Sequence, residues 1–141
     1  MNRRLSNVYQ AALKAYDSVN KATMSGRDVE AEVLTKAALK LKECRDNWEE
    51  NGPNDRLYSA LKYNQRIWTI LQVEIEKPEN PLPVALKRDL LRLSIFIDKR
   101  TVETLAFPSP EKLGILININ HNIAAGLRTR DLDAANPKAA A

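Results

Sequence analysis

Glycine is scarce in this chain, and cysteine and histidine occur once each. Four of the 141 residues are glycine, well below the ~7% of an average protein. Because hairpin turns and phosphate-binding loops depend on glycine, the scarcity disfavours an all-β fold and a nucleotide-binding loop. A single cysteine excludes an intramolecular disulfide, and a single cysteine with a single histidine excludes zinc sites built from several such ligands.

Long hydrophobic runs and a strong charge bias are also missing. No stretch of 18 apolar residues occurs, so we expect no membrane span. Residues 1–6 lead into no apolar run or cleavage site, so we predict no secretory signal and a reducing, cytoplasmic location. The net charge of +4 is ordinary, and a hydrophobic fraction of 44% is enough for one core in a chain of this length.

Seven prolines divide the chain into stretches that follow the helical period. Proline lacks a backbone N–H and clashes with the preceding turn, so it marks helix boundaries. Five helices are predicted, at residues 6–20, 25–50, 55–77 with Asn54 or Asp55 as the cap, 83–106 and 109–127. We therefore predict a single compact all-α bundle over residues 1–128. Residues 129–141 lack an apolar period and are expected to form a disordered tail.

Apolar side chains recur at intervals of three and four residues along each predicted helix, as expected for helices that pack on neighbours. In the first three helices these stripes are Leu5, Tyr9, Ala12, Tyr16 and Val19; Val29, Val33, Ala37, Leu41, Cys44 and Trp48; and Leu57, Leu61, Asn64, Trp68, Leu71 and Ile75.

The fourth helix carries two stripes, which are Leu86, Leu90, Leu93 and Ile97, and Leu91, Ile95, Val102 and Leu105. A helix that is apolar on two sides is usually central, so we expect neighbours on both. In the fifth helix, a strand over residues 115–119 is the alternative to a helix.

The residues give little support for catalysis or for nucleic-acid binding. His121 has no cysteine or carboxylate three or four residues away, so we interpret it as a surface or packed histidine. Cys44 lies on an apolar stripe and is interpreted as a small core residue. We expect no enzyme activity, metal or cofactor. Basic residues alternate with acids and aromatics make up only 6%, which disfavours a nucleic-acid site.

Four segments, taken in order, resemble the flagellar biosynthesis regulator family FlaF. They are Asn7-Val8-Tyr9-Gln10-Ala11-Ala12 with Ala15-Tyr16, Tyr63-Asn64-Gln65-Arg66-Ile67-Trp68, Glu79-Asn80-Pro81-Leu82-Pro83, and Pro110-Glu111-Lys112-Leu113 followed by Leu116 to Asn120 and Ile123 to Leu127. The resemblance covers about residues 5–128. The chain departs from the family at Asn118 and His121, where an acid and an arginine are more usual.

The resemblance implies a small cytoplasmic helical protein of flagellum assembly. Such proteins act beside the FlbT regulator and are thought to bind flagellin, whose terminal segments are amphipathic and aggregation-prone helices, as an export chaperone. We expect the client to be contacted by Tyr9, Tyr16, Tyr63 and Trp68 and to be oriented by Asn64 and Arg66. The alternatives are an RNA-binding regulator of the flagellin messenger and an adaptor that binds only FlbT.

Overall fold

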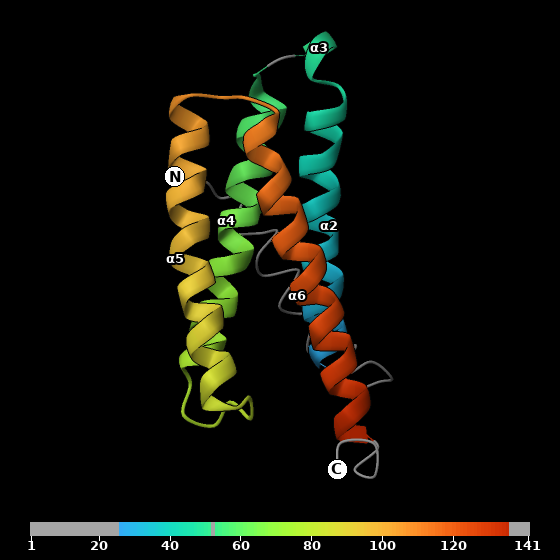
Figure 1. Cartoon of the computed structure of the whole chain (residues 1–141), viewed down its shortest axis with the longest axis vertical. Coiled ribbons are helices and arrows are strands. Elements are labelled where there is room, and N and C mark those ends of the chain that lie inside the picture. The colour runs from blue at the N-terminus through green and yellow to red at the C-terminus, as the bar shows by residue number, and fades with distance from the viewer. Residues whose placement is uncertain (1–25, 52, 136–141) are drawn as a thin grey trace.

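The computed structural model describes residues 26–51 and 53–135, and this part of the chain forms helices and no strand. The helices are α2 (Gly26–Asp46), α3 (Trp48–Asn51), α4 (Asp55–Glu76), α5 (Val84–Ala106) and α6 (Glu111–Ala135). The four long helices run side by side as a bundle, with the short α3 at one end (Figure 1). The predicted all-α fold is confirmed, whereas the helix predicted at residues 6–20 lies outside the described residues.

Local side-chain hydrogen bonds define both ends of α4. The Asn54 side-chain oxygen accepts a hydrogen bond from the Leu57 backbone N–H at 3.1 Å, which is the geometry of a helix N-cap. After the helix, the Asn80 side chain donates to the Glu74 carbonyl and accepts from the Leu82 backbone N–H, each at 3.0 Å. These bonds satisfy backbone groups that the helix end and the linker would otherwise leave open.

The helix predicted to run from residue 25 to residue 50 is interrupted at Asn47. The Asn47 side-chain amide donates to the Glu43 carbonyl at 2.8 Å, and its backbone N–H donates to the same carbonyl at 3.2 Å. Asparagine side chains compete with the backbone for such bonds, which weakens a helix at that position. As a result, α2 ends at Asp46 and Trp48 begins the separate turn α3.

The last helix is longer than predicted. Helix α6 continues to Ala135, so residues 129–135 do not follow the prediction of a disordered tail from residue 129. This segment has no apolar stripe, but it consists of Thr, Arg, Asp, Leu and Ala without glycine or proline. The strand alternative at residues 115–119 is wrong, because these residues are helical.

The core lies between the four long helices. All six residues of the stripe predicted for α4 are buried, from Leu57 to Ile75. In α2 the buried set is instead Ala31, Leu34, Ala37, Ala38 and Leu41. Ala31 and Ala38, seven residues apart, share one face and keep it small, and the contact between α2 and α6 is the most extensive in the bundle. Val29 and Val33, which were predicted to be core, are only half-buried.

The prediction that α5 is central and covered on both sides is wrong. Helix α5 packs on α4 and, to a lesser extent, on α6, and it lies at the edge of the bundle (Figure 1). Its inward face buries Leu90 and Ile97, whereas Ile95 and Val102 of the second stripe are 67% and 62% exposed. In a ring of four helices each helix has a single inward face, so the second stripe has no neighbour among the described helices.

A half-buried ion pair near the start of α2 predicts a pH-dependent stability. Arg27 donates to both Glu30 carboxylate oxygens, at 2.8 and 2.9 Å. Burial nevertheless raises the pKa of Glu30 above its ordinary value, with a further contribution from the Glu74 carboxylate, while Arg27 opposes the shift. The folded state therefore holds the Glu30 proton more tightly than the unfolded state does.

We expect Glu30→Gln to gain stability relative to the wild type as the pH rises. Below the ordinary pKa of the glutamate, both states of the wild type are protonated and this group contributes no pH dependence. As the pH rises toward the raised folded pKa, the unfolded wild type loses its proton first, so the wild-type protein loses stability that the variant keeps. Urea denaturation of both proteins at about pH 4 and pH 7 measures the difference. If the stability of Glu30→Gln minus that of the wild type stays constant or falls between the two pH values, the raised pKa of Glu30 is contradicted.

Candidate functional site

A hydrogen-bonded cluster in the core joins α2, α4 and α6. The Trp68 indole N–H donates to the Asn120 side-chain oxygen at 2.9 Å. The Asn120 amide donates to the Leu34 carbonyl at 3.1 Å and to the Asn64 side-chain oxygen at 2.7 Å. All four residues are at most 1% exposed. We call Leu34, Asn64, Trp68 and Asn120 the Asn120 network.

The Asn120 network places two of the predicted binding residues inside the core. Asn64 and Trp68 present no surface to a partner in this structure, because both side chains are buried. Their hydrogen bonds fix the axial register of α4 and α6, because a shift of one helix by one turn would leave buried polar atoms without partners. The network therefore sets the register of the three helices.

Two other predicted binding residues lie on the outer side of α4. Tyr63 is half-buried, and the Lys40 ammonium group of α2 lies 5.1 Å from its ring centroid. Burial raises the pKa of the Tyr63 hydroxyl. Arg66 is also half-buried. Tyr9 and Tyr16 lie outside the described residues, so the predicted set of six stays a prediction, of which the structure places Asn64 and Trp68 in the core and Tyr63 and Arg66 half-buried.

The most exposed apolar helix face in the described part of the chain belongs to α5. Val84, Ile95 and Val102 are 77%, 67% and 62% exposed, and Leu91 is half-buried. Intervals of seven, four and seven residues place these side chains along one face of the helix. We call this set the α5 outer stripe.

The α5 outer stripe continues onto neighbouring elements. The Gln65 amide of α4 donates to the Asp98 carboxylate of α5 at 3.4 Å, which fixes the register of the two antiparallel helices. Tyr58, 56% exposed and two turns before Gln65, consequently lies beside the last turns of α5. Phe107, 75% exposed, follows α5 directly, and the Lys112 ammonium group lies 5.6 Å from its ring centroid.

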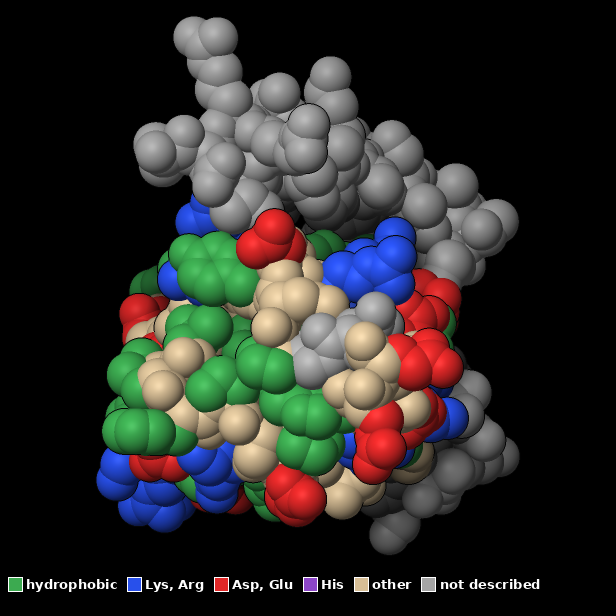
Figure 2. All heavy atoms as spheres, turned by 90° about the horizontal axis from the view of Figure 1, so that it is seen from above, with side chains coloured by type: hydrophobic (Ala, Val, Ile, Leu, Met, Phe, Trp, Pro, Cys, Tyr) green, Lys and Arg blue, Asp and Glu red, His purple; other side chains and the backbone are tan. Residues whose placement is uncertain are grey.

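The end of the bundle next to this face is apolar and is bordered by charged side chains of both signs. Seen toward the end of the bundle where α5 ends and α6 begins, hydrophobic side chains gather on the surface, and both basic and acidic side chains lie at their edge (Figure 2). Along α5 itself, the basic residues Arg88, Arg92 and Lys99 are exposed, as are the acidic residues Asp89 and Asp98. The arrangement suits an apolar partner surface with acidic flanks.

The sequence contains the signal for this face, but its interpretation requires the structure. The spacing of Leu91, Ile95 and Val102 predicts a second apolar stripe, for which the expected neighbouring helix is not found among the described helices. The exposed apolar patch next to this stripe includes Phe107. This residue lies in the connection between two helices, so helical periodicity does not identify it.

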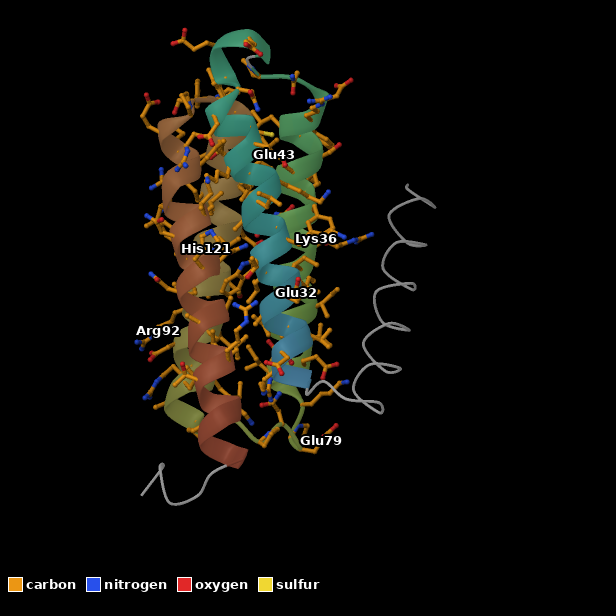
Figure 3. All side chains as sticks on the ribbon, turned by 90° about the vertical axis from the view of Figure 1, so that its right-hand side faces the viewer. Glu32, Lys36, Glu43, Glu79, Arg92 and His121 are labelled. Atoms are coloured by element: carbon orange, nitrogen blue, oxygen red, sulfur yellow. The ribbon has the colours of Figure 1, made fainter. Side chains whose placement is uncertain are left out.

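The residues that could carry chemistry are dispersed. Cys44 is half-buried, and burial together with the Glu43 carboxylate raises the pKa of its thiol against the opposing effect of Arg56. A raised pKa disfavours the nucleophilic thiolate. His121 is exposed on α6, while Glu32 and Glu43 are spread along α2 (Figure 3).

The described residues hold no group of three His, Cys, Asp or Glu side chains placed to bind a metal ion. Within the same residues, no helix is both long and apolar enough to cross a bilayer.

Comparison with known proteins identifies one family. No curated protein and no solved structure matches the sequence. The family described as flagellar protein FlaF matches over residues 12–127, a range that includes α2 to α5, the Asn120 network and most of α6. The match covers most of the chain and agrees with the resemblance of its four segments. The chain therefore belongs to the FlaF family of flagellar proteins.

Proposed function

We propose that this protein is a cytoplasmic, non-enzymatic chaperone that binds flagellin for export and regulates flagellin synthesis together with FlbT. Membership of the FlaF family supports a role in the flagellum. The observation that carries the chaperone function is the α5 outer stripe, because it is an apolar helix face that no described helix covers. A client with an amphipathic terminal helix can bury its own apolar face there.

The energetics of such a contact come mainly from apolar burial. Each Å² removed from water contributes roughly 25 cal/mol before the entropy lost on association is subtracted. Val84, Ile95 and Val102 are largely solvent-exposed in the free protein, so their burial is still available to a client. Arg88, Arg92 and Lys99 add an electrostatic attraction for acidic flanks, which we expect to affect the association rate more than the affinity.

The proposal predicts that charge placed in the α5 outer stripe disrupts flagellin binding. We expect the full-length double variant Ile95→Asp/Val102→Asp to bind monomeric flagellin at least about tenfold more weakly than the wild type, because two carboxylates would be buried without partners. The measurement is a calorimetric titration of purified flagellin. Leu39→Asp is the matched control, since Leu39 is 53% exposed on α2 and the same chemical change there should leave the affinity unchanged.

Parallel titrations with flagellin, with the flagellin messenger and with FlbT separate the alternative functions. Equal binding by the wild type and the double variant would remove the α5 outer stripe from the site. Binding of the flagellin messenger, with an affinity that falls steeply with salt, would favour the RNA-binding regulator. Binding of FlbT without any binding of flagellin would favour the adaptor. The chaperone proposal requires a flagellin complex that tolerates moderate salt, because apolar contacts are weakly screened.

A further inference from the structure

A second apolar face lies between α2 and α4, on the side away from the other long helices. It consists of half-buried hydrophobic side chains, which are Val29 and Val33 on α2 and Tyr63, Ile67 and Ile70 on α4. We call this set the α2–α4 face. It is separate from the α5 outer stripe, and the flagellin-binding proposal does not use it.

A contact at one end and an electrostatic interaction at the other, between two helices that pack on each other, indicate that α2 and α4 present these residues on a common side. The Lys40 ammonium group, on the same stripe of α2 as Val33, lies 5.1 Å from the Tyr63 ring centroid. At the other end, the charge of the Glu74 carboxylate acts on Glu30 and adds to the raised pKa of that group. The stripes on α2 and α4 therefore run next to each other over about three turns.

The neighbouring long helices lie on other sides of this pair. Arg128 of α6 reaches α2 at the Thr35 hydroxyl, at 3.5 Å, and Ser94 of α5 reaches α4 at Gln72, at 3.4 Å. Thr35 and Gln72 are on the sides of their helices that point away from the α2–α4 face. Figure 3 shows α2 and α4 next to each other, with α6 on the far side of α2. None of the described long helices thus covers the face.

The length of chain before α2 matches this face. Helix α2 begins at Gly26, one turn before Val29, so the preceding chain enters at one end of the face. The apolar stripe from Leu5 to Val19 would span about 21 Å as a helix, and the part of α2 from Val29 to Lys40 spans about 17 Å. Residues 20–25 can extend over about 20 Å, which is enough to reverse the chain direction.

We propose that residues 5–19 of this chain dock on the α2–α4 face as an amphipathic helix that runs antiparallel to α2. In this arrangement Val19 lies toward the Val29 end of the face and Tyr9 toward the Tyr63 end. The docked segment buries its own stripe and the half-buried valines and isoleucines of the face at once. A partner helix that uses the α2–α4 face has to displace this segment first. The inference concerns the chain alone and holds whether or not flagellin is the client.

Hydrogen exchange on the full-length protein tests the docking. We expect the backbone amides of residues 9–19 to be protected in the wild type and to exchange about tenfold faster or more in Val33→Asp, because a carboxylate in the face opens the segment without unfolding the core. Leu39→Asp, with the same change on another side of α2, should leave this exchange unchanged. Absence of protection in the wild type, or equal exchange in Val33→Asp and the wild type, overturns the proposal.

A distance measurement covers the case in which Val33→Asp unfolds the protein. A nitroxide on Lys36→Cys in a Cys44→Ser background lies on exposed α2 near the face, and it should broaden the amide signals of residues 9–19. The same label on Lys99→Cys of α5 should leave those signals sharp. Broadening by the label on α5 and not by the label on α2 contradicts the proposal. Broadening that appears only when spin-labelled protein is mixed with isotope-enriched protein that carries no spin label also contradicts it, because the segment would then dock on a second copy.

Discussion

Replacing Trp68 with alanine is expected to lower the free energy of unfolding by about 3–5 kcal/mol, the usual loss for a large aromatic side chain in a packed core. Trp68 is 1% exposed, and its indole N–H donates to Asn120 at 2.9 Å. The substitution removes the ring and leaves the Asn120 side-chain oxygen without this donor. Chemical denaturation monitored by far-ultraviolet circular dichroism measures the loss, because it does not depend on the tryptophan signal.

Two further substitutions separate packing from hydrogen bonding at this position. Trp68→Phe keeps most of the ring and removes the N–H, so we expect it to lose about 1–3 kcal/mol, the penalty for a buried acceptor left unsatisfied. Trp48→Ala is the control for the residue type, because Trp48 is only half-buried at the end of the bundle. Equal losses for Trp68→Ala and Trp48→Ala would show that the Asn120 network does not have the importance assigned to it.

The second large effect is expected from Asn120→Asp, which preserves shape and exchanges a donor for a charge. The Asn120 amide donates to the Leu34 carbonyl and to the Asn64 side-chain oxygen. A carboxylate at position 120 would face both acceptors and would be buried without a counter-ion. We expect a loss of about 3–5 kcal/mol near neutral pH, as for a buried charge deprived of its partner.

The Asn120→Asp variant should recover part of its stability in acid. Burial and the two facing acceptors raise the folded-state pKa of the new carboxyl group above its unfolded value, so the folded state holds the proton more tightly. Stability from protonation is fully present below the unfolded pKa and is lost as the pH rises through the folded pKa. Denaturation of variant and wild type between about pH 4 and pH 7 measures this trend. Asn120→Ala, which cannot titrate, is the control, and identical pH profiles for the two variants would contradict the mechanism.

These core substitutions also help to interpret the binding experiments. The Asn120 network lies inside the bundle, whereas the α5 outer stripe is on its surface. A variant such as Trp68→Ala can therefore reduce flagellin binding only through the population of folded protein. Ile95→Asp/Val102→Asp should act on binding while the core stays intact, so stability and affinity together distinguish a direct contact from an unfolding effect.

The amino-acid sequence by itself determined where most helices lie and which face of α4 is buried. The stripe from Leu57 to Ile75 follows the helical period without interruption, and all its members are in the core. Asn54 and the prolines around residues 78–83 act through local backbone chemistry, so they could be recognised without knowing the neighbours. Asn47 was missed as a break because its side-chain bond to Glu43 competes with a helix pattern that continues on both sides.

Only the tertiary structure decided which apolar faces are covered and which predicted binding residues are accessible. Periodicity identifies both stripes of α5, but the number and position of neighbouring helices determine that Leu90 and Ile97 are buried while Ile95 and Val102 face solvent. The same holds for Asn64 and Trp68, whose partner Asn120 lies 56 and 52 residues away in the chain. A local pattern reports the amphipathicity of one helix, whereas burial and hydrogen-bond pairing depend on contacts between distant segments, and these exist only after the helices have packed.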